Sequence, residues 1–198
     1  MSSAESMPED EAFPRWLVPP EGGFLAEDLD RLPKLPPHTE LIDGGLVFVS
    51  PQQEIHGLVI ELLLDGLRRA APANLRARRE MTVTLGRQLR VEPDVLVIDA
   101  GAAGLDKTTY LPESVHLVVE VVSPDSQVRD RGRKPELYAQ AGIAHFWRVE
   151  NVDGRPVVYV YELDPASRTY ALRGIHHDRL AVALPFHLDI DLQAIDRL

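Results

Sequence analysis

The sequence predicts an α/β domain with a mixed central sheet flanked by helices and with additional β-hairpins. Two nearly continuous runs of Val, Ile and Leu, at residues 91–98 and 115–122, are typical of strands buried on both faces. A helix-like stretch and a third apolar run at 144–149 follow the second run, which makes one strand-helix-strand unit. The two strands of such a unit lie parallel in one sheet. A chain of 198 residues is long enough for one domain with a sizeable core.

The first half of the chain predicts a lead-in, a hairpin and a helix. Residues 1–24 are acidic and rich in proline, so we expect a disordered segment before a domain that spans residues 25–198. Two short apolar runs around a Gly-Gly pair predict a hairpin over residues 40–49. Between residues 55 and 67 the apolar positions recur at helical spacing, which predicts a helix with one buried stripe.

Two more hairpins are predicted around the strand-helix-strand unit. Residues 76–85, a turn at Gly86 and residues 88–98 predict two paired strands, of which the second enters the core and includes the 91–98 run. The helix of the unit is expected from residue 129 to 141, because Gly142 is a typical helix end. Residues 157–172 predict a late hairpin across an Asp-Pro turn.

Two carboxylates stand inside the buried strands, Asp94 in the first and Glu120 in the second. A buried charge is costly unless it is paired, hydrogen-bonded or bound to a cation. Either residue alone could be paired with a buried arginine or could cap a loop. If the strands are neighbours, however, both carboxylates can converge on one cation at the end of the sheet. Together they suggest a divalent metal and phosphoryl-transfer chemistry.

Lys134 stands near the start of the predicted helix, on the stripe that it shares with Leu137, Tyr138 and Ala141. From there it can reach back over the sheet toward Glu120. Such a lysine could orient an attacking water or stabilise the charge that develops on phosphorus. The alternative is a side chain whose stem is buried and whose ammonium lies in solvent.

Composition limits the possible ligands and partners. The chain has no cysteine, so a metal must be held by oxygen or imidazole, which favours Mg²⁺ or Mn²⁺, and a cytoplasmic setting fits. No apolar run is long enough for a membrane span, and the first residues do not have the pattern of a signal peptide. The net charge of −10 argues against a generic nucleic-acid binder. Between residues 68 and 90, however, seven arginines accompany one acid, which is compatible with a phosphate-binding stripe or with a solvated, charge-protected edge strand.

Five segments, in order within residues 26–195, resemble the Uma2 family of the PD-(D/E)XK restriction-endonuclease-like superfamily. The segments are Glu40-Leu41-Ile42-Asp43-Gly44, Pro93-Asp94-Val95, Val119-Glu120-Val121-Val122-Ser123-Pro124, Arg129-Asp130-Arg131-Gly132-Arg133-Lys134-Pro135-Glu136-Leu137-Tyr138 and Ala141-Gly142-Ile143-Ala144-His145-Phe146-Trp147. The resemblance implies a restriction-endonuclease-like fold and a Mg²⁺ or Mn²⁺ site.

The resemblance also implies roles for single residues. Asp94 and Glu120 match the metal ligands of the superfamily. The superfamily lysine normally stands two residues after the glutamate, where this chain has Val122. Uma2-like sequences instead have a lysine on the following helix, which here is Lys134. Glu40 matches an early glutamate of the family that can join the metal site, although it could also be the polar start of a hairpin strand.

Two further residues have simpler explanations than metal binding. His56 opens the first long helix at a family-like position, and a lone histidine is usually structural or exposed. Asp130 fits a helix N-terminal acid or a salt-bridge partner better than a metal ligand.

Three functions are compatible with the sequence. The first is a Mg²⁺- or Mn²⁺-dependent nuclease that hydrolyses phosphodiester bonds of nucleic acid, with DNA as the expected substrate and with Asp94, Glu120, Lys134 and Glu40 in the site. The second is a catalytically silent nuclease-fold domain that binds nucleic acid or protein. The third is a structural protein whose buried acids are paired with Arg129 or Arg131.

Partners are predicted as well. The expected nucleic-acid contacts are Arg76, Arg78, Arg79 and Arg131. A homodimer is expected from the family resemblance and from the late hairpin. The row of Val157, Val158, Val160 and Tyr161 would give that hairpin apolar surface on both faces.

Overall fold

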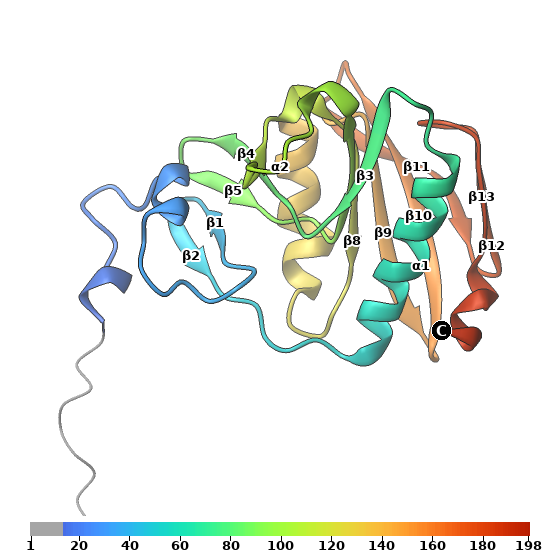
Figure 1. Ribbon diagram of the computed structural model, residues 1–198, viewed down its shortest axis with the longest axis horizontal. Coiled ribbons are helices and arrows are strands. Elements are labelled where there is room, and N and C mark those ends of the chain that lie inside the picture. Colours follow the sequence, from blue (N-terminus) through green and yellow to red (C-terminus); the bar gives the residue numbers. More distant parts are fainter. Residues whose placement is uncertain (1–13) are drawn as a thin grey trace, which may run out of the picture.

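The computed structural model describes residues 14–198, which form two larger sheets, two helices and a C-terminal ribbon (Figure 1). Helix α1 (Glu54–Ala70) lies on one face of the larger sheet, and helix α2 (Lys134–Gln140) lies on the other. The predicted α/β class with a mixed central sheet is confirmed. No helix in this part of the chain is both long and apolar enough to cross a membrane.

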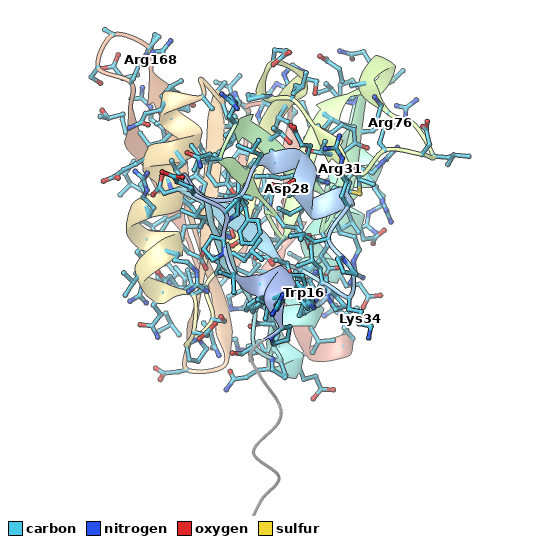
Figure 2. All side chains as sticks on the ribbon, turned by 90° about the vertical axis from the view of Figure 1, so that its left-hand side faces the viewer. Trp16, Asp28, Arg31, Lys34, Arg76 and Arg168 are labelled. Atoms are coloured by element: carbon cyan, nitrogen blue, oxygen red, sulfur yellow. The ribbon has the colours of Figure 1, made fainter. Side chains whose placement is uncertain are left out.

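The larger sheet has six strands in the order β11-β10-β9-β8-β6-β3. Its strands are β3 (Leu75–Arg79), β6 (Val95–Asp99), β8 (Val115–Val121), β9 (His145–Val152), β10 (Arg155–Asp164) and β11 (Thr169–His176). As the strand-helix-strand pattern predicted, β8 and β9 are parallel, whereas the other neighbours are antiparallel. Figure 2 shows Arg76, from β3, and Arg168, from the β10–β11 turn, at opposite sides of the molecule, as expected for the two edges of this sheet.

The pleat of β6 and β8 separates two apolar clusters. Val97 and Val119 pack with α1 on one face, and Leu96 and Val118 pack with α2 on the other. Because side chains alternate along a strand, Glu120 shares the α2 face with Val118. The one carboxylate inside β8 therefore points toward the helix that carries Lys134.

The smaller sheet has five strands in the order β2-β1-β5-β4-β7. Its strands are β1 (Glu40–Ile42), β2 (Gly45–Val47), β4 (Thr82–Gly86), β5 (Leu89–Val91) and β7 (Thr109–Tyr110). The predicted hairpin over residues 40–49 is confirmed as β1–β2, with a turn in which Asp43 and Gly44 both have positive φ angles.

The predicted single strand over residues 91–98 is wrong, because the chain changes sheets inside it. β5 ends at Val91 in the smaller sheet, and β6 begins at Val95 in the larger sheet. Between them stands Pro93, which has no N–H to donate to a sheet ladder. Asp94 therefore lies at the crossing between the two sheets, immediately before β6.

The helix predicted from residue 129 to 141 is present but begins irregularly. A π-helical turn, Arg129–Arg133, runs directly into α2. Pro135 explains the widening, because its ring clashes with the carbonyl four residues earlier and its nitrogen donates no hydrogen bond. Lys134, Leu137 and Tyr138 of the predicted stripe are buried. The helix predicted over residues 55–67 is confirmed as α1.

The chain closes against the other side of α1. The C-terminal elements are β12 (Arg179–Val182), β13 (Leu188–Asp191) and the 3₁₀ helix η6 (Leu192–Arg197). Ile190 and Ile195 from these elements belong to the α1 cluster. The short 3₁₀ helices elsewhere are η1 (Arg15–Leu17), η2 (Ala26–Asp30), η3 (Ala100–Ala102) and η4 (Pro112–Ser114).

The predicted lead-in is described only in part. Its residues 1–13 lie outside the described residues, while η1 lies within residues 14–24 and Phe24 is buried beside Leu41.

The late hairpin is confirmed as β10–β11. The apolar surface predicted from Val157, Val158 and Val160 is wrong, because these side chains are buried, and Tyr161 is half-buried.

Candidate active site

A cleft of about 580 Å³ lies between the β5–β6 crossing, the start of α1, the end of β8 and the π-helical turn. Acidic side chains dominate its lining: Glu40, Glu54, Glu80, Glu92, Asp94, Glu120 and Asp130. The basic side chains in the lining are His38, His56, Arg129 and Lys134. The structure thus brings the predicted residues Glu40, Asp94, Glu120 and Lys134 together in one cleft.

The Lys134 ammonium lies at the centre of a buried carboxylate cluster. Its Nζ atom is 2.9 Å from Glu40 Oε1, 3.0 Å from Glu120 Oε2 and 3.5 Å from Asp130 Oδ1. The lysine side chain is only 6% exposed, so the alternative with the ammonium in solvent is excluded. We call Glu40, Glu120, Asp130 and Lys134 the buried cluster.

Glu120 is bonded by two residues that lie one helical turn apart on α2. Lys134 donates to its Oε2 atom, and the Tyr138 hydroxyl donates to Oε1 at 2.5 Å. Both donors come from α2 because Glu120 is on the α2 face of β8. A carboxylate with two donors on one side has a fixed orientation, and each oxygen keeps a further lone pair for another partner.

Asp94 lies at the cleft side of the cluster and is 18% exposed. Its Oδ2 atom accepts a hydrogen bond from the backbone N–H of Val121 at 2.6 Å, and its Oδ1 atom is 3.1 Å from His56 Nε2. The first bond ties Asp94 to the residue that follows Glu120. The second ties it to α1, so residues from two elements, β8 and α1, hold this carboxylate.

Glu40 is held from the smaller sheet. Its Oε1 atom accepts from the backbone N–H of Glu92 at 2.8 Å and also contacts Lys134. Glu40 is the first residue of β1, as expected if it is the polar start of a hairpin strand. Its side chain is nevertheless only 2% exposed and contacts Lys134 in the buried cluster. The Glu92 carboxylate instead pairs with His38 at the cleft entrance.

Burial and like charges shape the electrostatics of the cluster. Burial raises the pKa of Glu120 well above its usual value, against the opposing effect of Lys134, and burial also raises the pKa of Asp130. Burial alone would lower the pKa of Lys134, but the carboxylates of Glu120, Glu40 and Asp130 together raise it well above its usual value. With Asp94, four carboxylates face one ammonium, so the site has an excess of negative charge.

Asp130 belongs to the site, whereas the sequence predicted only a helix N-terminal acid or a salt-bridge partner. It is not a solvated helix acid: its side chain is 2% exposed, and its Oδ1 atom has no hydrogen-bond partner among the described residues. The salt-bridge interpretation is closer, since Lys134 is its ionic neighbour. A signal was present in the sequence, because residues 130, 134 and 138 are spaced by four and so share one helix face.

The predicted nucleic-acid arginines lie outside the cleft. Arg76, Arg78 and Arg79 are on β3, an edge strand, and Arg131 forms an exposed pair with Glu150 at 2.7 Å. Arg79 pairs with Glu80, whose carboxylate lines the cleft, at 2.7 Å. Among the described residues, none of the four arginines forms an ion pair with Glu40, Asp94, Glu120 or Asp130. The pairing of the buried acids with Arg129 or Arg131 is wrong as well, because Lys134 is the cation that contacts them.

The carboxylates fit an oxygen-bound divalent cation by their chemistry. Among residues 14–198, no set of three or more His, Asp or Glu side chains is already arranged to hold a metal ion. The excess negative charge and the unpartnered Asp130 oxygen nevertheless suit an additional cation, and carboxylate oxygens are the ligands that Mg²⁺ and Mn²⁺ prefer. Asp94 and Glu120 are the residues that would hold it.

The chain thus combines a mixed-sheet α/β fold with an acidic cleft. A comparison with family profiles matches residues 26–194 to Uma2, described as "Putative restriction endonuclease". The chain belongs to the Uma2 family. A comparison with curated proteins finds no significant match.

A solved structure shares this fold. The chain is similar to the crystal structure of "a putative nuclease belonging to DUF820" from Anabaena variabilis ATCC 29413, with a TM-score of 0.64 and 16% identity over 85% of this chain and 95% of that one. A weaker similarity is to cAAA-bound NucC of P. aeruginosa ATCC27853, with a TM-score of 0.34 and 13% identity over 64% of this chain and 85% of that one.

Proposed function

We propose that this protein is a Mg²⁺- or Mn²⁺-dependent nuclease that hydrolyses phosphodiester bonds of DNA. The observation that carries the proposal is the convergence of Asp94, Glu120 and the buried ammonium of Lys134 in one cleft. Membership of a family of restriction-endonuclease type supports the reaction class. A cytoplasmic location stays a prediction from the sequence.

Each residue of the site has a part in this proposal. Asp94 and Glu120 would hold the divalent ion, which when bound would supply a Lewis acid for the phosphate and lower the pKa of a bound water. Lys134 stabilises the negative charge that develops on the phosphate and, together with Tyr138, keeps Glu120 in place. Glu40 fixes the Lys134 ammonium from the opposite side, and His56 fixes Asp94 from α1.

The direct test is a metal titration and a cleavage assay on Asp94→Asn. We expect the wild-type protein to bind Mn²⁺ and to nick plasmid DNA, and the variant to lose both, because a ligand charge is removed. Isothermal titration calorimetry measures the binding, and gel electrophoresis measures the cleavage. Asp99→Asn is the matched control, since Asp99 ends the strand β6 that Asp94 precedes, lies outside the cleft lining, and pairs with His116. Asp94→Asn with undiminished Mn²⁺ affinity and cleavage would refute the proposal.

A catalytically silent nuclease-fold domain is the second candidate. It is favoured by one observation, namely that both oxygens of Glu120 already have donors from α2. A panel of single-stranded and double-stranded DNA and RNA separates the two candidates. Binding without cleavage in Mg²⁺ and in Mn²⁺ would support the silent domain.

We also propose that the protein is a homodimer that pairs through β11. This strand is an edge of the larger sheet, and Leu172 and Ile175 on it are 49% and 46% exposed. An edge strand offers unpaired backbone N–H and C=O groups to a second copy. Light scattering at micromolar concentration should give twice the 22.1 kDa monomer mass. Ile175→Lys should halve that value, and a monomer mass for the wild-type protein would refute the dimer.

A further inference from the structure

Buried polar atoms without a partner gather at the cleft. Five such side-chain atoms occur in the described part of the chain, and three of them belong to side chains that line the cleft: His56 Nδ1, Arg129 Nε and Asp130 Oδ1. Since buried polar groups are normally hydrogen-bonded, a group left unpaired needs a specific explanation. At a cleft the simplest explanation is a ligand, and the chemistry of each atom indicates what that ligand offers. Arg129 Nε can only donate, so it needs an acceptor.

Arg129 is the cation in the cleft lining that is still available to bind an anionic ligand. Lys134, the other lysine or arginine in the lining, is already surrounded by three carboxylates. Arg129 has one ionic contact in the described residues, with Asp125 at 3.4 Å, which is long for a charge-assisted hydrogen bond. Its side chain is 27% exposed and belongs to the cleft lining, while its Nε atom is buried.

The two other arginines of the π-helical turn are engaged elsewhere. Arg131 is bonded to Glu150 through two guanidinium nitrogens, at 2.9 Å and 2.7 Å. Arg133 donates to both oxygens of Asp43, at 2.7 Å and 2.8 Å. The three arginines of the π-helical turn thus lie in three different environments, and Arg129 is the one among them that lines the cleft.

We propose that Arg129 binds the substrate phosphate, its guanidinium donating to a non-bridging oxygen of the phosphodiester next to the buried cluster. This inference rests on the proposed function, because it takes the substrate to be a nucleic acid. A planar guanidinium matches the oxygens of a phosphate with two parallel hydrogen bonds. It also answers an electrostatic difficulty, since a polyanion must approach a cleft lined by seven carboxylates. The contact is to the backbone and therefore independent of base sequence.

The test measures binding of a labelled 20-base-pair DNA duplex across a salt series, with Ca²⁺ as the metal and a gel to verify that the duplex stays intact. We expect Arg129→Gln to weaken the duplex affinity by about 10- to 100-fold, the effect of one hydrogen bond to a charged group. The slope of log affinity against log salt should become shallower by about 0.9, the value for one lost phosphate contact. Arg129→Lys should keep the slope but lower kcat/KM for cleavage, because the fork geometry is lost. Mn²⁺ affinity should stay at the wild-type value in both variants.

Arg133→Gln is the matched control, because it removes a guanidinium from the same turn outside the cleft, and it should leave affinity and slope unchanged. Wild-type affinity and slope in Arg129→Gln would overturn the inference, as would a wild-type protein that binds no duplex. If Arg129→Gln does not fold, Arg129→Lys decides, and wild-type cleavage in that variant would overturn the inference. A wild-type protein that binds the duplex but cleaves nothing in any metal refutes the nuclease, while the salt slopes still decide the role of Arg129.

Discussion

Glu120→Gln is expected to lose divalent-metal affinity and phosphodiester cleavage together. Glu120 is 1% exposed and has two donors from α2, so its position is fixed whether or not a metal is present. The amide has no charge to offer a cation and no second anionic oxygen. We expect kcat/KM to fall on the order of 10³-fold, the size of effect seen when one preorganised electrostatic group is removed from a site. Mn²⁺ titration by calorimetry and cleavage under the same conditions measure both losses.

The control for this variant is Glu113→Gln, which removes a carboxylate from the exposed approach to β8. It should keep wild-type affinity and activity. Wild-type Mn²⁺ affinity in Glu120→Gln would contradict its role as a ligand, even if cleavage were lost. Urea unfolding without metal verifies that the variant is folded.

Lys134→Met is expected to destabilise the metal-free protein by about 3–5 kcal/mol, the usual cost of removing one partner from a buried ion pair. Lys134 is the cation that contacts Glu40, Glu120 and Asp130. Methionine keeps most of the side-chain volume, so the loss reports the missing charge rather than a cavity. Mn²⁺ affinity should rise, because a neighbouring cation no longer repels the metal. Cleavage should fall, because the charge that stabilises the transition state is gone.

The pH dependence of this variant has a definite sign. Burial and neighbouring carboxylates raise the pKa of Glu120 and of Asp130 in the folded protein. An acid whose folded pKa is raised destabilises the fold as the pH rises above its unfolded value, near 4.5 for Glu. Lys134 partly offsets this penalty at neutral pH, so the difference between Lys134→Met and the wild-type protein should shrink as the pH falls from 7 toward 5.

Urea unfolding at several pH values, with and without Mn²⁺, measures these effects. Lys107→Met, in an exposed loop, is the control and should unfold like the wild-type protein. If Lys134→Met has wild-type stability and undiminished cleavage, then Lys134 is neither the cation that stabilises the cluster nor part of the chemistry.

Local sequence patterns were sufficient to predict which face of a strand or helix carries each site residue. Alternation along residues 115–121 placed Glu120 opposite Val119, and helical spacing placed Lys134 on the stripe of Leu137 and Tyr138, as the structure has them. Both patterns depend only on the geometry of a single strand or helix. The family resemblance, which the sequence motifs suggested over most of the chain, was confirmed by the match to the family over residues 26–194.

Pairings between distant segments were harder to predict. Residues 91–98 read as one apolar run, and nothing local states that β5 pairs in one sheet and β6 in another. The apolar hairpin residues Val158 and Val160 suggested an interface, but they pack in the same core cluster as α1 and the C-terminal elements. The spacing of Asp130 and Lys134 places both on one helix face, but it does not show that this face is buried against Glu40 and Glu120 from distant segments.

The central claim is that Asp94 and Glu120 share one divalent cation beside the Lys134 ammonium. A crystal soaked in Mn²⁺ and measured for anomalous scattering tests it directly. The account predicts one strong peak in the cleft, about 2.0–2.6 Å from a carboxylate oxygen of each residue. A cleft without a peak at saturating Mn²⁺, or a peak bound by residues other than these two, would contradict it.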